Sequence, residues 1–278
     1  MSDPDLRMIA LGAGVQSTTL YLLAATGELM PRPDVAIFAD TQSEPAWVYE
    51  HLDWLESHWG LAIPIRRVTA GSLEADCLAS RDGQRRWAAL PLFTQPETGR
   101  NRHGRLRRQC TREYKIRPLM RAARAMLGLK PRQRAAGRVR VEEWIGISAD
   151  EAHRAKPSRH QWITTQWPLL DLGMTRADCV DWLVARGLPV PRKSACVFCP
   201  FHDDATWAWM KRAAPAEFAR ACAFDAAVRE GRLRGVRGPA YVHRSLRPLA
   251  EVEFRPVAGG ADELERTFGE ECEGRCGV

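Results

Sequence analysis

The stretch that most constrains the fold runs from Met8 to Leu23 and reads MIALGAGVQSTTLYLL. A short apolar run enters a turn that contains Gly12 and Gly14, and a helical pattern begins at Thr18. This order predicts a strand, a tight turn and a helix. Glycines let the backbone approach a bound group, and the free N–H groups at the start of a helix favour an anion. An ordinary strand-to-helix turn of an α/β domain is the alternative that this stretch leaves open.

The spacing of the turn does not fit the two best-known phosphate loops. A Walker loop requires a Gly-Lys-Ser/Thr end, and the dinucleotide fingerprint requires a third glycine where this chain has Ser17. The turn instead resembles the PP-loop of ATP pyrophosphatases, Ser-Gly-Gly-x-Asp-Ser, in the variant of the phosphoadenosine-phosphosulfate reductase-like branch. Two positions depart from that pattern, with Leu11 at the first serine and Gln16 at the aspartate. The resemblance implies that Mg²⁺-ATP binds at Leu11, Gly12, Ala13, Gly14, Val15, Gln16 and Ser17.

Composition limits the class of protein. A chain of 278 residues is long enough for one large α/β domain, with or without a smaller appendage. No apolar run approaches the length of a membrane span, and the start MSDPDLR does not fit a signal peptide, so we expect a cytoplasmic protein without a membrane partner. The net charge of +7 suits an anionic partner, although only five of the 41 basic residues are lysines. The eight cysteines are too few for a disulfide scaffold, and clustered ones favour metal binding or reactivity.

Polar residues follow the second predicted strand, residues 34–40, which reads DVAIFAD. The carboxyl end of a parallel strand is where open α/β sheets place ligand contacts, so Asp40 and Thr41 are candidates for the ATP site. The alternative is that Asp40 caps the helix that follows. The run FADTQSEP is similar to the second block of the same family, a strand that ends in Asp-Thr-Gly, with Gln42 in place of the glycine.

A third strand is predicted over residues 61–68, at an edge of the sheet because it contains Pro64. The segment from Thr69 to Arg108 shows little periodicity and is predicted to be a long loop. Its arginines are interleaved with aromatic residues, which suits a lid over a phosphate-bearing substrate. A merely solvated loop is the alternative, and the sequence does not decide between them.

A single cysteine precedes the next predicted helix. Cys110 would lie at a helix start beside Arg112 and Lys115, a setting that favours the thiolate, although a chance exposed cysteine would give the same pattern. The segment resembles the Cys-Cys-x-x-Arg-Lys-x-x-Pro-Leu block of sulfonucleotide reductases, with Gln109 in place of one cysteine. The resemblance implies that Arg112 and Lys115 contact the nucleotide.

A fourth strand is predicted over residues 139–147 and again ends in polar groups. The block from Gly146 onward is similar to the family's Gly-Ile-Arg-x-x-Glu-Ser-x-x-Arg, with Ser148 where arginine is common. The resemblance implies that Gly146, Glu151 and Arg154 belong to the nucleotide site. A further strand at the Pro-Leu of TQWPLLD and a helix over residues 176–187 then lead to the cysteine pair below.

Cys196 and Cys199 form a C-x-x-C pair, which is half of a zinc, iron-sulfur or redox site. Cys110 is one candidate for the missing ligand, and the tail supplies Cys272 and Cys276. A 4Fe-4S cluster is favoured by the family resemblance, and Zn²⁺, with His202 as an additional ligand, is the alternative. The tail cysteines could instead deliver a reactive thiol, as the C-terminal cysteine of sulfonucleotide reductases does, and a frayed terminus is the alternative for them. Cys77, Cys179 and Cys222 are predicted to be structural.

These observations predict an α/β, Rossmann-like (HUP-type) parallel sheet flanked by helices, with a helical, cysteine-containing C-terminal part. The expected division places the nucleotide-binding domain at 1–170, with a basic insertion at about 70–108, and the C-terminal region at 171–278. The favoured activity is adenylation of a small-molecule or nucleic-acid acceptor by ATP, followed by transfer of sulfur from a donor. A sulfonucleotide reductase that releases sulfite and a zinc-containing nucleic-acid-binding module are the alternatives. Catalysis is assigned to Ser17, Cys110, Cys272 and Cys276, and a homodimer is left open.

Overall fold

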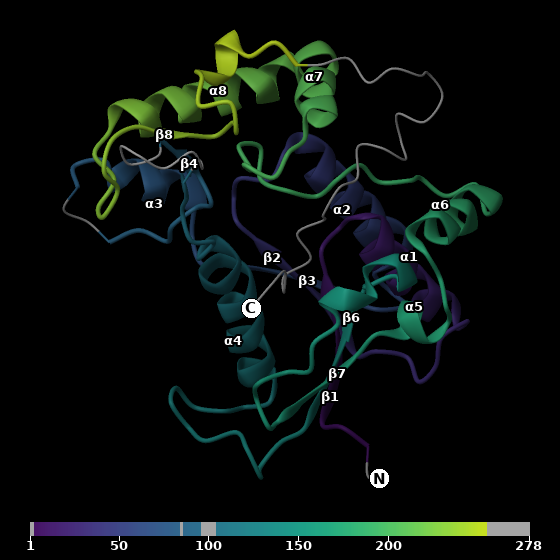
Figure 1. The fold of residues 1–278 in the computed structure, drawn as a ribbon. Coiled ribbons are helices and arrows are strands. Elements are labelled where there is room, and N and C mark those ends of the chain that lie inside the picture. Colours follow the sequence, from purple (N-terminus) through teal and green to yellow (C-terminus); the bar gives the residue numbers. More distant parts are fainter. Residues whose placement is uncertain (1–2, 84–85, 96–103, 255–278) are drawn as a thin grey trace.

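The computed structural model describes residues 3–83, 86–95 and 104–254 of the chain. A five-stranded parallel sheet lies at its centre, with the strand order β3-β2-β1-β6-β7 (Figure 1). Helices flank the sheet, so the predicted α/β, Rossmann-like architecture is confirmed. The strands are β1 (Leu6–Leu11), β2 (Val35–Asp40), β3 (Ile65–Thr69), β6 (Val141–Ile145) and β7 (Ile163–Gln166).

Both faces of the sheet are covered around its central strands, as the continuous apolar run of β2 requires. Met8 and Ile37 face α4 (Arg117–Met126), whereas Ile9 and Phe38 face the opposite side. That opposite side is covered by α1 (Val15–Thr26), α2 (Ala46–Trp59) and α6 (Arg176–Ala185). Alternate residues of each strand therefore belong to different cores.

The strand order places a topological switch point between β1 and β6. The chain leaves β1 through α1 toward β2 and β3, and later returns to the other side of β1 to form β6. Ligands of open α/β sheets bind at the carboxyl ends of the strands at such a point. The turn after β1 and the segment after β6 therefore occupy the expected position of a ligand site.

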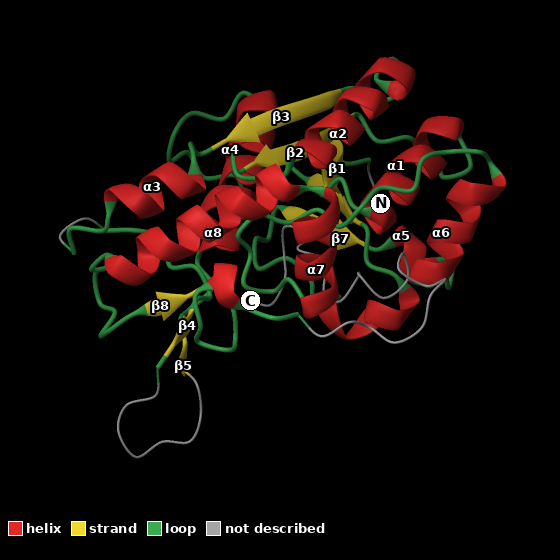
Figure 2. Cartoon of the chain, turned by 90° about the horizontal axis from the view of Figure 1, so that it is seen from above, coloured by secondary structure: helices red, strands yellow, loops and turns green. Residues whose placement is uncertain are grey.

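A second core lies beside the carboxyl edge of the sheet and joins two distant parts of the sequence (Figure 2). Residues 73–92 pack there against residues 197–249, with Phe198 stacked on Phe224 at 3.8 Å between ring centroids. Cys179 and Leu183 of α6, by contrast, pack in the core around α1. The elements of the second core are α3 (Leu73–Ala79), β4 (Phe93–Thr94), β5 (Gly104–Arg105), α7 (Asp204–Ala213), α8 (Pro215–Glu230) and β8 (Ala240–Tyr241).

Several predicted boundaries differ from the structure. Helix α1 begins at Val15, before Thr18, so Ser17 lies inside its first turn. The segment after Thr69 contains α3, β4 and β5, where the sequence predicted a loop, because its apolar side chains enter the second core. The Pro-Leu of TQWPLLD forms a helical turn, α5 (Pro168–Asp171), and no strand, since proline suits the first position of a helix.

Three short helical segments complete the described chain. They are η1 (Thr111–Ile116), a π-helical turn that runs into α4, η2 (Ala149–Arg154) and η3 (Leu249–Glu251). Across the described residues, no helix has both the length and the apolar character that crossing a membrane requires.

Candidate functional site

The turn after β1 is closed by its own side chain. The backbone N–H of Gly14 donates to Ser17 Oγ at 3.2 Å, and the Ser17 hydroxyl donates to the Gly14 carbonyl at 3.3 Å. Ala13 takes the left-handed conformation, with φ 59°, and Ser17 is fully buried. The turn is therefore a fixed structure at the start of α1, with the Ser17 hydroxyl directed at the backbone that a phosphate would approach.

The end of β6 touches this turn. A Cβ atom on Gly146 would lie 2.8 Å from the Ser17 nitrogen and 2.9 Å from its Cα, which is closer than side chains approach backbone. Glycine is therefore required where the end of β6 packs against the first turn of α1. Ser148 lies two residues further on, and the Gln16 side chain donates to its hydroxyl at 3.4 Å.

An arginine that the sequence analysis did not identify reaches the same turn from α6. Arg176 Nη1 donates to Gln16 Oε1 at 2.6 Å, and Gln16 Nε2 donates to Glu151 Oε2 at 3.2 Å. Glu151 also forms an ion pair with Arg154. Gln16 thus links two arginines to the loop at the position where the family pattern has an aspartate. No local sequence pattern indicates this contact, because Gln16 and Arg176 are 160 residues apart in the chain.

Asp40 ends β2 and orders the loop that follows it. Its Oδ1 accepts from the Gln42 backbone N–H at 2.7 Å and from the Tyr49 hydroxyl at 2.8 Å. Helix α2 begins at Ala46 with Pro45 at its cap, so the alternative that Asp40 caps this helix is wrong. Gln42 has φ 54°, a left-handed conformation in which glycine is favoured, and this explains the glycine of the family pattern at that position.

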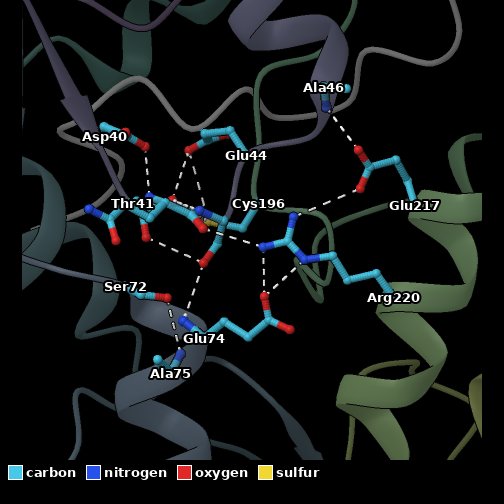
Figure 3. A network of polar contacts seen from close by, with 12 residues as sticks. Asp40, Thr41, Glu44, Ala46, Ser72, Glu74, Ala75, Cys196, Glu217 and Arg220 are labelled. Atoms are coloured by element: carbon cyan, nitrogen blue, oxygen red, sulfur yellow. Dashed lines mark hydrogen bonds and ion pairs between the residues drawn. The ribbon is translucent and has the colours of Figure 1, made fainter.

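The C-x-x-C pair lies against the same loop. The Val197 N–H donates to the Ser43 carbonyl at 2.8 Å, and Cys196 Sγ lies 3.3 Å from Thr41 Oγ1 and 3.9 Å from Glu44 Oε1 (Figure 3). Burial raises the pKa of the Cys196 thiol well above its ordinary value, the Glu44 carboxylate raises it further, and Lys115 opposes both. The thiol is therefore protonated at neutral pH until a metal or a reaction partner displaces the proton.

One cavity brings together three of the predicted cysteines. Cys110, Cys196 and Cys199 line a hollow that holds about 420 Å³ of empty space, part of it open to solvent. Thr41 and Lys115 also line it, so it opens beside the carboxyl end of β2. Segments more than 80 residues apart in the sequence thus present thiols to one space.

Lys115 connects this cavity with the end of β1. It lines the cysteine cavity and also a smaller one of about 280 Å³ that contains Leu11 and Gly12. Its ammonium lies 3.2 Å from Glu44 Oε1, and both side chains are buried, with 8% and 0% of their surface exposed. The buried ion pair of Lys115 and Glu44 therefore lies between the turn after β1 and the three cysteines.

The loop that carries Thr41 and Glu44 is fixed by the second core. Arg220 of α8 donates to Glu74 of α3 at 2.6 Å and to the Gln42 carbonyl at 3.3 Å, and the Ala46 N–H donates to Glu217 at 2.9 Å (Figure 3). None of these contacts was predicted. They hold the loop that follows β2 against α3 and α8 of the second core.

The remaining predicted site residues are placed as follows. Arg112 is exposed on η1. His202 is buried, its Nε2–H donates to the Cys196 carbonyl at 3.0 Å, and burial lowers its pKa to about 3. Cys77 and Cys179 are buried, and burial raises the pKa of Cys77 to about 12, as suits structural thiols. Cys272 and Cys276 lie outside the described residues.

The cysteine cavity contains candidate metal ligands. Three cysteines face it, and soft thiolates are the ligands of zinc and of iron-sulfur clusters. Within residues 3–83, 86–95 and 104–254, no group of three or more potential ligands converges closely enough to hold one metal ion. A zinc ion requires every sulfur at about 2.3 Å from one point, whereas a cluster offers several irons to thiolates that stand further apart.

Comparison with known proteins finds similarity among solved structures. No protein-family model matches the sequence, and no curated protein is similar to it. Among solved structures, the chain is similar to a phosphoadenylyl-sulfate (PAPS) reductase from Candida auris in a phosphate complex, with 14% sequence identity and a TM-score of 0.43. The similarity covers 68% of this chain and 76% of the reductase chain.

Proposed function

We propose that this protein is an ATP-dependent adenylating sulfurtransferase. The observation that carries the proposal is the position of Lys115, which lines both the cavity at Gly12 and the cavity of Cys110, Cys196 and Cys199. A nucleotide bound at the end of β1 would therefore have a buried cation and three thiols on one side. An adenylating site needs an anion-binding turn, and sulfur transfer needs a thiolate or a metal centre next to it.

The turn after β1 would hold the β- and γ-phosphates of ATP. The first N–H groups of a helix have no partner within it, and the dipole of α1 favours the charge of the phosphates. Arg176 and Arg154 would add positive charge through the Gln16 network. Asp40 and Thr41 would contact the nucleotide from the neighbouring strand, and Mg²⁺ would accompany the triphosphate.

The proposed chemistry has two steps. An oxygen of the acceptor attacks the α-phosphorus, the bond to pyrophosphate breaks, and an adenylate forms. Sulfide then forms a bond to the activated carbon, and AMP leaves with the oxygen. Where a cysteine persulfide delivers the sulfur instead, the product is first joined to that cysteine by a disulfide bond, and a second cysteine thiol breaks this bond to release the thiolated product, leaving a disulfide on the protein. Lys115 would stabilise the charge that develops on the α-phosphate, because a cation in a site shielded from water acts strongly on such charge.

Cys110, Cys196 and Cys199 would hold a 4Fe-4S cluster. Three protein ligands would leave one iron of such a cluster open to sulfide, which is the chemistry that the cluster would supply. In the alternative arrangement Cys272 would be a fourth ligand and would close that iron, and Cys276 is a proposed reactive thiol.

Pyrophosphate release tests the proposal. The wild-type protein, purified without oxygen and given ATP, sulfide and a candidate acceptor, should release pyrophosphate and AMP. Ser17→Ala should lower the rate at least about 100-fold, because one donor to developing charge is lost and the turn loses its closing hydrogen bond. Thr26→Ala, at the far end of the same helix, is the matched control and should leave the rate unchanged. Equal rates for wild type and Ser17→Ala would contradict the proposal, and release of sulfite from PAPS without ATP would replace it with a sulfonucleotide reductase.

A further inference from the structure

A second hollow, which we call the arginine groove, lies behind the segment that leads to Cys110. Arg86, Arg107 and Arg234 line it together with Trp87 and Gln109, and it holds about 820 Å³ of space open to solvent. Among the described residues that line it, none is acidic. The three arginines come from separate segments of the chain, and all three are exposed.

One stretch of backbone separates the arginine groove from the cysteine cavity. Arg107 and Gln109 line the groove, whereas Arg108 and Cys110 line the cavity. The stretch is held in place by backbone hydrogen bonds from Leu106 to Leu92 at 2.9 Å and from Gln109 to Ala89 at 2.8 Å. A molecule bound in the groove is thus separated from the cysteine cavity by this single backbone segment.

The charge around the groove extends beyond its lining. Four further exposed arginines lie on the same segments, and Asp82 is the single exposed acid in the described residues 81–83, 86, 104–108 and 232–238. Both terminal nitrogens of Arg86 are hydrogen-bonded to the Glu113 carboxylate, so the phosphate contacts are assigned to Arg107 and Arg234. Guanidinium groups bind phosphates in a bidentate way, and a series of them suits a polymer of phosphates better than a single anion. The four flanking arginines are Arg81, Arg105, Arg232 and Arg237.

The mouth of the cysteine cavity carries surfaces on which a base can stack. The guanidinium groups of Arg105 and Arg108 lie over the Phe201 ring, 5.2 and 4.9 Å from its centroid, and Phe201 lines the cavity. Unpaired bases stack on aromatic rings and on guanidinium planes. The groove and the cavity mouth therefore offer contacts for both parts of a nucleotide chain.

We propose that the arginine groove binds the phosphodiester backbone of a nucleic acid. Combined with the proposed function, on which this second step rests, the acceptor of the sulfur is an unpaired base of a polynucleotide, brought from the groove to the cavity of Cys110. A free base or nucleoside would leave the groove without a role.

Binding of labelled 20-nucleotide RNA and DNA, single-stranded and duplex, to the full-length protein tests the groove directly. Fluorescence anisotropy is measured across a range of salt concentrations for wild type and for Arg107→Glu combined with Arg234→Glu. The matched control is Arg134→Glu with Arg138→Glu. This variant changes the net charge equally, on exposed residues that precede β6 and therefore lie toward the amino ends of the strands. No ATP and no acceptor chemistry enters this assay.

The expected result is tight, salt-dependent binding by the wild type to at least one single strand. The groove variant should bind at least about tenfold more weakly, with a salt slope lower by about two, one for each lost phosphate contact, and the control should bind like the wild type. The preferred strand identifies RNA or DNA as the source of the backbone. Equal losses of affinity in both variants, or no binding by the wild type, would contradict the proposal that the arginine groove binds a nucleic acid. If pyrophosphate release with a nucleoside acceptor persists in the latter case, the sulfurtransferase stands and only the polynucleotide acceptor fails.

Discussion

Lys115→Met is expected to destabilise the protein by about 3–5 kcal/mol, because it leaves the Glu44 carboxylate buried without its cation. Glu44 is 1% exposed, and its second oxygen has no hydrogen-bond partner among the described residues. The nearest remaining polar contact of Glu44 Oε1 is the Thr41 hydroxyl at 3.3 Å. Urea denaturation of wild type and variant measures the difference in the free energy of unfolding.

The double variant Lys115→Met, Glu44→Gln separates stability from chemistry. Removing both charges should restore most of the lost stability, since a buried ion pair replaced by neutral groups of similar size is often tolerated. Pyrophosphate release should stay at least about 100-fold below wild type, because the cation beside the α-phosphate is still absent. Recovery of activity together with stability would show that Lys115 only neutralises Glu44.

Cys196→Ala is expected to abolish sulfur transfer and to remove the bound metal. Cys196 faces the cavity that it shares with Cys110 and Cys199, so its loss removes one of three described thiolates. Iron, acid-labile sulfide and zinc are measured on protein purified without oxygen. The wild type should contain iron and sulfide, and the variant should contain little of either.

Cys222→Ala is the matched control for that measurement. Cys222 lies on α8, packs against the second core, and is not among the residues that line the cysteine cavity. It should keep both the metal and the activity. Equal metal content in wild type and Cys196→Ala would contradict the thiolate centre, whereas stoichiometric zinc without sulfide would favour the tetrahedral alternative.

The central sheet was predictable because its strands are buried on both faces. The apolar run of β2 is continuous up to Asp40, whereas Arg7 interrupts β1 and two glutamates interrupt β6, and polar residues follow the end of β2 and β6. Helix α1 was placed three residues late, because Val15 to Ser17 read as part of the turn. Residues 73–94 were predicted as a loop because their apolar side chains pack against residues far along the chain, a contact without local periodicity.

The candidate site was predictable in its parts and less so in its connections. The motifs identified the turn, the C-x-x-C pair and Cys110, and the structure brings the three cysteines to one cavity. The contacts of Arg176 with Gln16 and of Arg220 with Glu74 join segments about 150 residues apart, and no local pattern indicates them. Glu44 also gave no signal, because its burial depends on the packing of η1 and the cysteine loop around it.

The account depends on ATP being bound at the end of β1 with its α-phosphate beside Lys115. A crystal structure of the full-length protein with α,β-methylene-ATP, which cannot release pyrophosphate, tests this most directly. We predict that the β- and γ-phosphates accept hydrogen bonds from the backbone between Gly12 and Ser17, with the α-phosphate between the two cavities that Lys115 lines. A triphosphate bound elsewhere on the molecule, or one beyond hydrogen-bond reach of that turn, would contradict it.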